Sequence, residues 1–306
     1  MVVNDAVVSN CFVLTQQDMY VAKGGAIFAR GVTLVHSKVS GNFAGTSSGA
    51  GTVEGAGIYT EGNLTAKYST ISNNSAYAGS QMVGGGAFVN SGNLYLNHST
   101  VSGNDSGGQA GGIYVSDYFG TYTARVVNST ISGNRSVQDV AGFATQATTT
   151  IANSTIAFNA SEAGFYTGGL RFKPSHGTTL TLQSSIIANN SMGGADADTS
   201  VDSGATVSGS NNLIVQHSGP IPGGTMSSCP LIGPLGDHGG ETHTHRLLLG
   251  SPAIDAGDNT TVNAAFDQRG GGYPRTHGAK TDIGAFEDQG VKPNAIFSAG
   301  FEGRCR

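Results

Sequence analysis

The sequence predicts an all-β fold, a parallel β-helix in which short strands stack coil upon coil. Two observations predict it. A phrase of the form Ser-Thr-Ile-Ser-Gly-Asn returns about every thirty residues, and a glycine-rich phrase that ends in an aromatic residue returns in step with it. A fixed period of this length is typical of a solenoid, in which each repeat buries its apolar side only against its neighbours.

The first phrase closes on an asparagine in every copy. We expect the isoleucine or valine three positions earlier to point inward and the asparagine to lie at a bend. There its amide can bond the equivalent amides above and below, forming a ladder that satisfies buried polar groups. Asparagine also tolerates the left-handed conformation that bends require. The six asparagines are Asn42, Asn74, Asn104, Asn134, Asn159 and Asn190, at spacings of 32, 30, 30, 25 and 31 residues.

The second phrase supplies the opposite bend of each coil. Its clearest copies are GGAIF (24–28), GAGIY (55–59), GGGAF (84–88) and GGIY (111–114). The glycines permit positive φ and close approach of backbones. The aromatic residues then form either a stack or a surface stripe, and the sequence leaves that choice open. They are Phe28, Tyr59, Phe88 and Tyr114.

Short alternating segments such as 32–35, 93–96 and 179–182 lie between the two phrases and predict strands. No window has a convincing 3.6-residue apolar period with caps, so we expect no long helix. The Leu-x-x-Leu-x-Leu pattern of leucine-rich repeats is absent, and a propeller blade would need a fourth strand. A coil is already under way at residue 5, because Cys11 precedes Asn42 by one period. We therefore expect that an N-terminal cap is missing and that the chain is part of a longer protein.

Composition excludes several classes of protein. The chain has 306 residues, 48 of them glycine, with only 11% charged side chains and a net charge of −5. Binding to DNA or RNA would need a basic face. No run of eighteen apolar residues predicts a transmembrane helix, and no signal peptide is visible. The cysteines Cys11, Cys229 and Cys305 are too few for a disulfide scaffold or a zinc ribbon. One pair, Cys229–Cys305, can form and leave an odd thiol.

The thirty-residue repeat ends after Asn190, and a segment with different motifs follows. It contains CPLIGPLGDHGGETHTHRLLLGSPAIDAGD (229–258), DQRGGGYPR (267–275) and DIGAFE (282–287). These motifs, in this order, resemble the choice-of-anchor Q domain of bacterial surface proteins, although His238 stands where that family more often has Asn. We therefore divide the chain into β-helix coils (1–215), a terminal module (216–290) and a short tail (291–306).

The resemblance implies export to the surface of a bacterium or to its medium. The coils resemble right-handed parallel β-helix repeats, so a right-handed solenoid with a C-terminal capping module is the fold implied. GGAI at 24–27 is also similar to the repeat of the polymorphic outer-membrane proteins. The ending at 296–302 is similar to short tails of secreted proteobacterial proteins.

Two polar clusters suggest metal sites. Asp237, His238, Glu241, His243 and His245 fall within nine residues, and His243 and His245 would share one face of a strand, as zinc ligands can. The family pattern keeps only the position of His245, which favours a structural role in which it bonds a turn carbonyl. Asp196, Asp198 and Asp202 can supply oxygens to Ca²⁺, but they lack the calcium-binding nonapeptide of toxin-type β-rolls, so a solvated loop is the favoured alternative. No cofactor is expected otherwise.

The charged residues of the module are expected to be structural. In a module that covers the end of a solenoid, opposite charges most simply form ion pairs and hydrogen bonds to exposed strand edges. The residues concerned are Asp255, Asp267, Arg269, Arg275, Asp282 and Glu287.

We expect a non-catalytic, secreted or surface-displayed stalk of adhesin type, which contacts glycans or other surfaces through hydroxyl-rich faces. The main alternative is a lyase or glycoside hydrolase that acts on acidic polysaccharide. Such enzymes need paired carboxylates, or a basic residue and an acid along one groove. The sparse charges of the coils do not recur at equivalent positions, so the sequence predicts no catalytic residue. A passenger segment of an autotransporter-like protein is a third alternative, disfavoured because no barrel strands follow residue 290.

Overall fold

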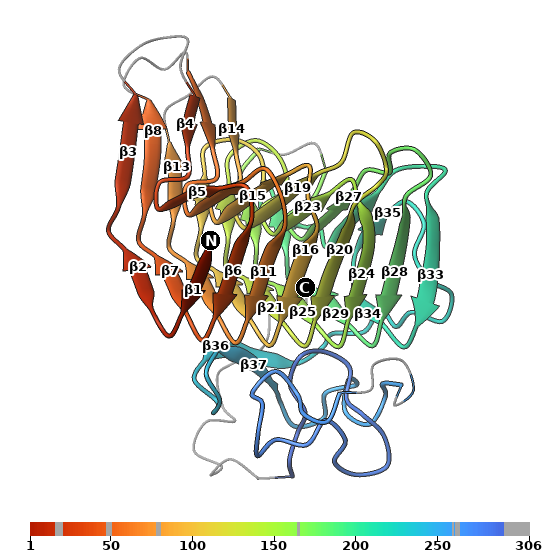
Figure 1. Cartoon of the computed structure of the whole chain (residues 1–306). Helices are drawn as coiled ribbons and strands as arrows, with labels where there is room; N and C mark the ends of the chain where they lie inside the picture. The colour runs from red at the N-terminus through yellow and green to blue at the C-terminus, as the bar shows by residue number, and fades with distance from the viewer. Residues whose placement is uncertain are drawn as a thin grey trace.

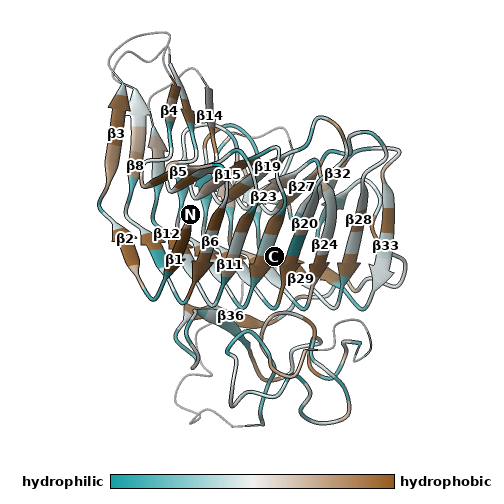
Figure 2. Cartoon of the chain, viewed as in Figure 1, coloured by the Kyte–Doolittle hydropathy of each residue, from teal (hydrophilic) through white to brown (hydrophobic). Residues whose placement is uncertain are grey.

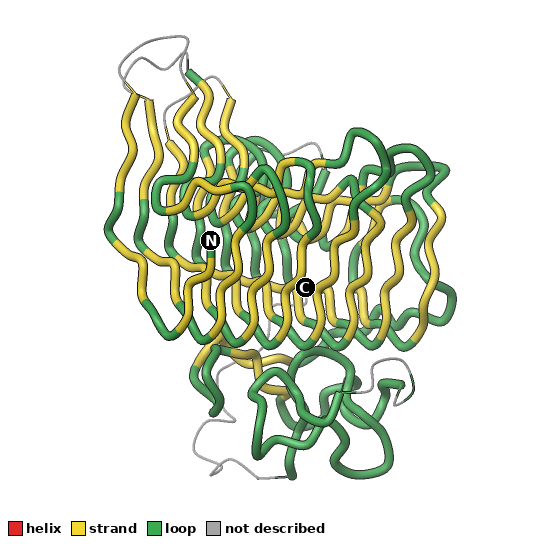
Figure 3. The backbone as a smooth tube through the Cα atoms, viewed as in Figure 1, coloured by secondary structure: helices red, strands yellow, loops and turns green. Residues whose placement is uncertain are grey.

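The structure is a computed structural model, and it describes residues 1–15, 21–46, 51–77, 81–163, 166–258, 260 and 264–290. These residues form an all-β protein without a helix, a parallel β-solenoid with coils of about 30 residues and about seven turns. Figure 1 shows the coils stacked side by side, and Figure 3 shows that strands dominate the coils while loops dominate the C-terminal module. The fold class predicted from the repeat is confirmed.

Four long sheets form the walls of the solenoid, and each coil passes through them in the order E, A, B, C. Sheet A contains β1 (Val2–Asn4), β6 (Val32–Val35), β11 (Leu64–Lys67), β16 (Leu94–Asn97), β20 (Thr123–Val127), β24 (Thr148–Ala152), β28 (Thr179–Gln183) and β33 (Thr206–Ser210). Sheet B contains β2 (Val7–Ser9), β7 (Lys38–Ser40), β12 (Thr70–Ser72), β17 (Thr100–Ser102), β21 (Thr130–Ser132), β25 (Thr155–Ala157), β29 (Ile186–Ala188) and β34 (Leu213–Ile214).

The other two walls complete each coil. Sheet C contains β3 (Phe12–Thr15), β8 (Phe43–Thr46), β13 (Ser75–Tyr77), β18 (Asp105–Ser106), β22 (Arg135–Ser136), β26 (Ala160–Ser161), β30 (Ser191–Met192) and β31 (Ala195–Asp196). Sheet E contains β5 (Ile27–Ala29), β10 (Ile58–Thr60), β15 (Ala87–Asn90), β19 (Ile113–Ser116), β23 (Phe143–Thr145), β27 (Leu170–Phe172), β32 (Thr199–Val201) and β35 (His217–Ser218). Since β35 pairs with β32, the solenoid reaches Ser218.

Two smaller sheets complete the fold. Sheet D consists of β4 (Val21–Lys23), β9 (Thr52–Glu54) and β14 (Gln81–Val83), an extra strand in each of the early coils. Sheet F is the antiparallel hairpin of β36 (Ile232–Gly236) and β37 (Thr244–Leu247) in the C-terminal module. Figure 1 shows sheet D rising beyond the coils on one side and sheet F lying on the opposite side.

The apolar residue of the first phrase faces the core, as expected. In sheet B, Ile71 pairs in register with Val101, which pairs with Ile131, and each is at most 1% exposed. Ile156 continues the row. Stacking like side chains at the strand spacing of about 4.8 Å lets each coil bury its apolar face against the next.

The asparagine ladder predicted from the sequence is present and buried. The Nδ2 of Asn74 donates to Asn104 Oδ1 at 2.9 Å, and the backbone N–H of Asn74 donates to the same oxygen at 3.0 Å. The same pair of bonds joins each of the six asparagines to the next one along the solenoid. At the first coil, the N–H of Cys11 donates to Asn42 Oδ1 at 3.0 Å. The expected equivalence of Cys11 and Asn42 is therefore confirmed.

The second phrase runs in step with the first because its glycines lie against the ladder. A Cβ on Gly86 would lie 3.0 Å from Asn104 Cγ and 2.6 Å from the carbonyl oxygen of Gly112. Gly57 stands in the same relation to Asn74 one coil earlier. Gly55 has a φ of 62° and makes the left-handed bend that precedes the strand. In five successive coils a glycine thus lies against one asparagine amide.

The aromatic residues of the second phrase stack on the outer face of sheet E. The ring centroids of Phe28 and Tyr59 are 5.3 Å apart, those of Tyr59 and Phe88 are 5.5 Å apart, and those of Phe88 and Tyr114 are 5.3 Å apart. The row therefore lies outside the core, yet Tyr59 is fully buried while Phe28 is exposed. The four rings therefore form a stack that is also a stripe on the outer face of sheet E.

Short segments near the last coils bond to two of the strands at the C-terminal end of the stack. Strand β31 folds back antiparallel on β30. Met226 forms a bridge to Leu213 at the edge of β34, and Ile221 packs against the core. These short segments bond to β30 and β34, while β33 and β35 each pair with one neighbour only among the described residues.

The module lies along the side of the solenoid, so its expected position over the end is wrong. Its apolar residues pack on the outer face of sheet B, where the last coils carry outward-facing Ile186 and Leu213. Its apolar core consists of Ile232, Leu247, Ala253, Ile283 and Phe286. Figure 1 shows the blue loops of the module beneath β21, β25 and β29. The apolar outer face of the last coils of sheet B therefore holds the module.

Candidate functional site

Neutral polar groups form part of the contact between the module and the coils. Gln268 is fully buried, accepts from Thr130 Oγ1 at 2.6 Å and donates to Thr100 Oγ1 at 2.9 Å. The N–H of Ala285 donates to Thr155 Oγ1 at 3.1 Å. Because successive coils present threonines at equivalent outer positions of sheet B, one module can bridge several turns.

His245 has a structural position, as the sequence suggested. Its Nδ1 donates to the carbonyl of Gly233 at 2.7 Å and its Nε2 lies 2.8 Å from Ser132 Oγ, which joins hairpin to coil. Burial lowers the pKa of His245 to about 4, so the ring is neutral and its Nε2 accepts from the serine. The carbonyl that it bonds lies on strand β36 rather than in a turn.

The predicted metal ligands do not assemble. His243 is exposed and precedes β37, so it does not share a strand face with buried His245. Among the described residues, no group of three or more His, Cys, Asp or Glu side chains could hold a metal ion.

The three aspartates proposed for calcium lie in different surroundings. Asp196 is exposed, and Asp202 pairs with Arg171 at 2.6 Å. Asp198 is buried, and its Oδ1 accepts from Asn190 N at 2.9 Å and from Asn190 Nδ2 at 3.0 Å. Asp198 therefore occupies the next rung of the asparagine ladder, so the expectation of a solvated loop is wrong for it. Burial raises its pKa to about 6, against the hydrogen bonds that it accepts.

The module's charged residues bond mainly to one another and to the module's own loops. Arg269 forms a buried pair with Asp267, with Nη2 and Oδ2 at 2.7 Å, and its guanidinium lies 3.9 Å from the ring centroid of Tyr273 and 3.8 Å from that of Phe286. Asp255 Oδ1 accepts from two backbone N–H groups, at 279 and 280. The expected ion pair is present, while the expected bonds to exposed strand edges are not among these contacts.

Asp282, Glu287 and Arg275 form a second buried charge cluster. Glu287 accepts from the N–H of Asp282 and from that of His277, both at 2.8 Å, and lies 3.8 Å from Arg275. Asp282 accepts from the N–H of Asp255 at 2.8 Å. Burial raises the pKa of Asp282 to about 6 and that of Glu287 to about 8. These carboxylates organise loops that contain little regular structure.

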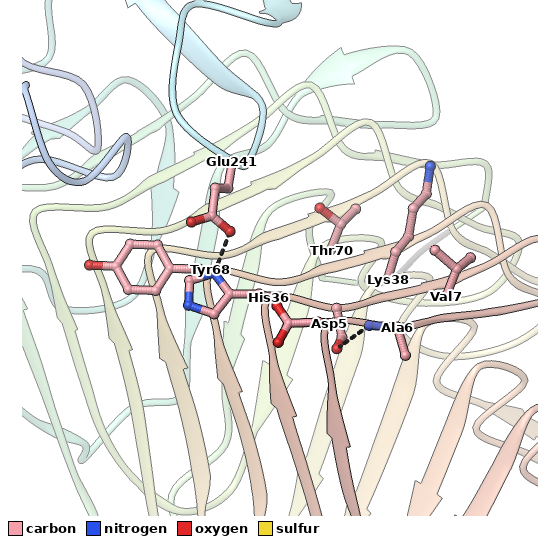
Figure 4. A pocket seen from close by; sticks show the side chains of 9 residues that line it. Asp5, Ala6, Val7, His36, Lys38, Tyr68, Thr70 and Glu241 are labelled. Carbon is pink, nitrogen blue, oxygen red and sulfur yellow. Dashed lines mark hydrogen bonds and ion pairs between the residues drawn. The ribbon is translucent and has the colours of Figure 1, made fainter.

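An open groove of about 560 Å³ lies where the module meets the first coils. Figure 4 shows Glu241 of the module reaching His36 across this junction, with the Tyr68 ring beside them. His36 Nδ1 forms a short hydrogen bond to Glu241 Oε2. The side chains that give the groove its chemistry are Asp5, His36, Lys38, Tyr68, Thr70 and Glu241.

The aromatic wall of the groove, formed by His36 and Tyr68, belongs to a longer row of bend residues. His36, Tyr68 and His98 occupy equivalent left-handed bends, with φ of 46°, 48° and 51°. The rings of His36 and Tyr68 stack with centroids 5.2 Å apart, and those of Tyr68 and His98 are 4.7 Å apart. The sequence analysis missed this row, although each residue stands two positions before the threonine or lysine that opens a strand of sheet B.

A second charged cluster lies where sheet D meets sheet E. Lys23 Nζ donates to Tyr59 Oη at 2.9 Å and lies 3.6 Å from Glu54 Oε2 and 3.7 Å from Glu61 Oε1. Burial is the largest influence on Glu54 and raises its carboxyl pKa, and nearby Lys23 opposes that rise. Sheet D thus brings Glu54 to the same lysine as Glu61, an arrangement that the sequence analysis did not foresee.

Charges also meet at equivalent coil positions on sheet C, which the sequence analysis did not foresee. Asp105 pairs in register with Arg135, and their side chains lie 3.5 Å apart. Arg135 also contacts Glu162. All three are well exposed, so this line of charges contributes little to stability.

The outer face of sheet A is a third candidate surface, flat and rich in hydroxyls. Its strands are in register, and the outward side chains form a row along the solenoid, none of them buried. The row consists of Thr33, Thr65, Tyr95, Arg125, Thr150, Thr181 and Ser208.

No family model, curated protein or solved structure matches this chain. The structure shows a parallel β-solenoid, and the comparisons with known proteins identify no family for it. Within the described residues, no helix is long and apolar enough to cross a membrane. Cys11 is a free thiol and Cys229 is disulfide-bonded, while Cys305 and the tail from 291 onward lie outside the described residues.

Proposed function

We propose that this chain is an exported, non-catalytic solenoid of a bacterial surface, which binds glycans in the groove between the module and the first coils. The observation that carries the proposal is the composition of that groove. It combines a stacked aromatic wall with carboxylates, an ammonium and hydroxyls around an open space.

Sugar rings are complementary to such a groove. A pyranose presents an apolar C–H face, which packs on an aromatic ring, and hydroxyls that hydrogen-bond to charged groups. Asp5 and Glu241 supply acceptors, and Lys38 supplies a donor. Because two carboxylates face one lysine, the groove favours neutral or amino sugars over polyuronides.

The oxidation state of one cysteine supports export. Cys229 is disulfide-bonded, and disulfides persist in oxidising compartments. The resemblance of 229–287 to a module of surface proteins implies the same location. The hydroxyl-rich face of sheet A gives an extended surface suited to weak, repeated contacts.

A glycan array followed by calorimetric titration tests the proposal. We expect binding to neutral or amino-sugar glycans, with affinity reduced about tenfold in Lys38→Ala and in Glu241→Gln, since each removes a charge-assisted hydrogen bond. Arg125→Ala, an exposed change on sheet A, serves as the matched control and should bind like the wild type. Absence of binding to every glycan, or equal loss in the control, would refute the proposal.

A carbohydrate-active enzyme is the second candidate, and the cluster at Lys23 favours it. Glu54, with its raised pKa, and Glu61 lie on either side of one lysine, an arrangement that acid–base chemistry on a glycosidic bond can use. A reducing-sugar and unsaturated-product assay decides between the two. Turnover that disappears in Glu54→Gln and Glu61→Gln would replace the binding proposal with the enzymatic one.

A further inference from the structure

The loop between β19 and β20 displays two adjacent aromatic side chains to solvent. Tyr118 is 68% exposed and Phe119 is 72% exposed. Large aromatic side chains that are exposed together are typical of binding sites. Figure 1 and Figure 2 show β19, β23 and β27 on the side of the solenoid away from the module, and no residue of this loop lines the groove. The loop is therefore separate from the site of the proposed function.

The buried carboxylate of Asp117 fixes the backbone of this loop. Its oxygens accept from the backbone N–H groups of residues 119–122, at distances between 2.8 and 3.3 Å. Ser175, in the loop after β27, donates from its Oγ to the carbonyl of Asp117. These bonds order the loop without burying its exposed rings. A ligand can therefore contact Tyr118 and Phe119 at a small cost in conformational entropy.

Arg171 fixes a third exposed ring on the same wall. Its strand, β27, pairs in register with β23, which pairs with β19, so Arg171 follows Ala144 and Tyr114 in one outward row. The guanidinium of Arg171 lies 3.6 Å from the ring centroid of Tyr166, and its Nη1 lies 2.6 Å from Asp202 Oδ1. Arg171 is itself buried, whereas Tyr166 is 43% exposed. The cation therefore positions Tyr166 rather than contacting a ligand.

Tyr114 links the loop to this cluster. Burial raises the pKa of Tyr114 to about 12, the nearby Tyr118 and Asp139 add to the rise, and Arg171 opposes it. Burial also raises the pKa of Asp139, and the nearby Arg171 and Lys173 oppose that rise. These rings and charges therefore belong to one region of the outer face of sheet E.

We propose that Tyr118, Phe119 and Tyr166 form a second glycan-binding site, which takes an uncharged sugar chain. The inference rests on the proposed function for the class of ligand. Aromatic rings pack on the apolar C–H faces of pyranoses. The exposed ammonium of Lys173 can donate to the sugar hydroxyls.

The balance of charge in this region favours an uncharged ligand. Arg171 and Lys173 are matched by Asp139 and Asp202, so these groups have no excess of either sign to attract a uronic acid. Because the groove lies on another side of the solenoid, one molecule can hold two glycans at once. Two sites on one chain strengthen binding to a surface that carries many glycans.

Isothermal titration calorimetry of the full chain with neutral oligosaccharides of glucose, xylose and N-acetylglucosamine tests the second site. The groove variant Lys38→Ala with Glu241→Gln should keep the binding that belongs to this site. Adding Tyr118→Ala and Phe119→Ala should weaken the remaining binding about tenfold, because two stacking rings are lost. Both rings face solvent, so the melting temperature should not change. Tyr77→Ala, at a 63% exposed tyrosine of β13, is the matched control in the same background and should bind unchanged.

Three outcomes would overturn the inference. They are a groove variant with no residual binding, residual binding that the loop substitutions do not weaken, and tighter binding of an oligogalacturonate than of the neutral sugars. The two sites fail separately. Binding that survives the groove substitutions in full and is lost with the loop substitutions would refute the groove and support the second site.

Discussion

Asparagine side chains have two different effects on the stability of this solenoid, and burial determines which effect each one has. Asn104 is fully buried, and its amide joins two rungs of the ladder. Asn63 is exposed and accepts from Asn93 Nδ2 at 3.0 Å at another bend. Both make amide–amide bonds, but only the buried amide leaves its partners without water when it is removed.

Asn104→Ala should therefore lower the melting temperature strongly. It leaves the N–H of Asn74 without its acceptor, and Asn74 Nδ2, Asn134 Oδ1 and the carbonyl of Ile71 each lose one bond. At about 1–3 kcal/mol for each buried unsatisfied group, the free energy of unfolding should fall by several kcal/mol. Asn63→Ala is the matched control and should cost about 1 kcal/mol or less. Equal losses in thermal denaturation would show that the ladder has no special role.

Asp198 gives the last rung a pH dependence. Its pKa is raised from 3.8 to about 6 in the folded protein, so the folded state holds the proton more tightly than the unfolded state. The contribution of this group to stability is therefore full below about pH 4 and is lost as pH rises through about 6.

Asp198→Asn should remove this dependence. The amide loses the bond from Gln216 N to Oδ2, which is a pH-independent cost. The melting temperature of the variant should nevertheless rise relative to that of the wild type between about pH 4 and pH 7. Calorimetric scans across this range check it. A constant difference between the two proteins would mean that Asp198 does not titrate in this window.

At the scale of elements, the glycine phrase and the asparagine phrase are two sides of one packing contact. Gly86 has no room for a Cβ, because Gly112 O and Asn104 Cγ would lie 2.6 and 3.0 Å away. This contact explains why the two phrases keep a common period. The sequence displayed both phrases but not their contact, since β15, β16 and β17 separate Gly86 from Asn104 along the chain, and the expectation that the glycines form the opposite bend is wrong.

Gly86→Ala should destabilise the protein by about 1–3 kcal/mol, because the neighbouring backbone must shift. Gly271→Ala is the matched control, since a Cβ there meets nothing within 4 Å. Urea denaturation should separate the two variants. If both unfold at the wild-type midpoint, the coils are more loosely packed than this contact requires.

At the scale of the whole molecule, the repeat predicted the solenoid well, because each coil obeys the same rule. It did not predict where the module lies, because that depends on single polar contacts between residues far apart in the sequence, such as Gln268 with Thr100 and Thr130. One signal was present. SIIANN places a second isoleucine, Ile186, where four of the earlier phrases have threonine and the first has Lys38, which gives the last coils of sheet B an apolar outer face.

The candidate site could not be predicted from the sequence for the same reason, because its residues lie far apart along the chain. The groove forms between Glu241 and a bend 205 residues earlier. Sheet D brings Lys23 and Glu54 together. Asp198 takes over from Asn190 after eight residues rather than thirty, because the chain turns back at β31 before it reaches the ladder again.

The module's stability should rest on its buried ion pair. Arg269→Ala leaves the Asp267 carboxylate buried with no guanidinium, at a cost of about 3–5 kcal/mol. Asp255→Ala should also lower the melting temperature, because the N–H groups at 279 and 280 lose their acceptor. Differential scanning calorimetry checks both, and near-wild-type melting of both variants would refute the structural role of these charges.

Hydroxyl-radical footprinting with a bound glycan tests the central claim most directly, because it reads the solvent access of individual side chains. The account predicts that the glycan lowers modification of His36 and Tyr68 in the groove and leaves Tyr95 on sheet A unchanged. Protection of Tyr95 with His36 and Tyr68 unchanged would contradict it and place the binding surface on sheet A.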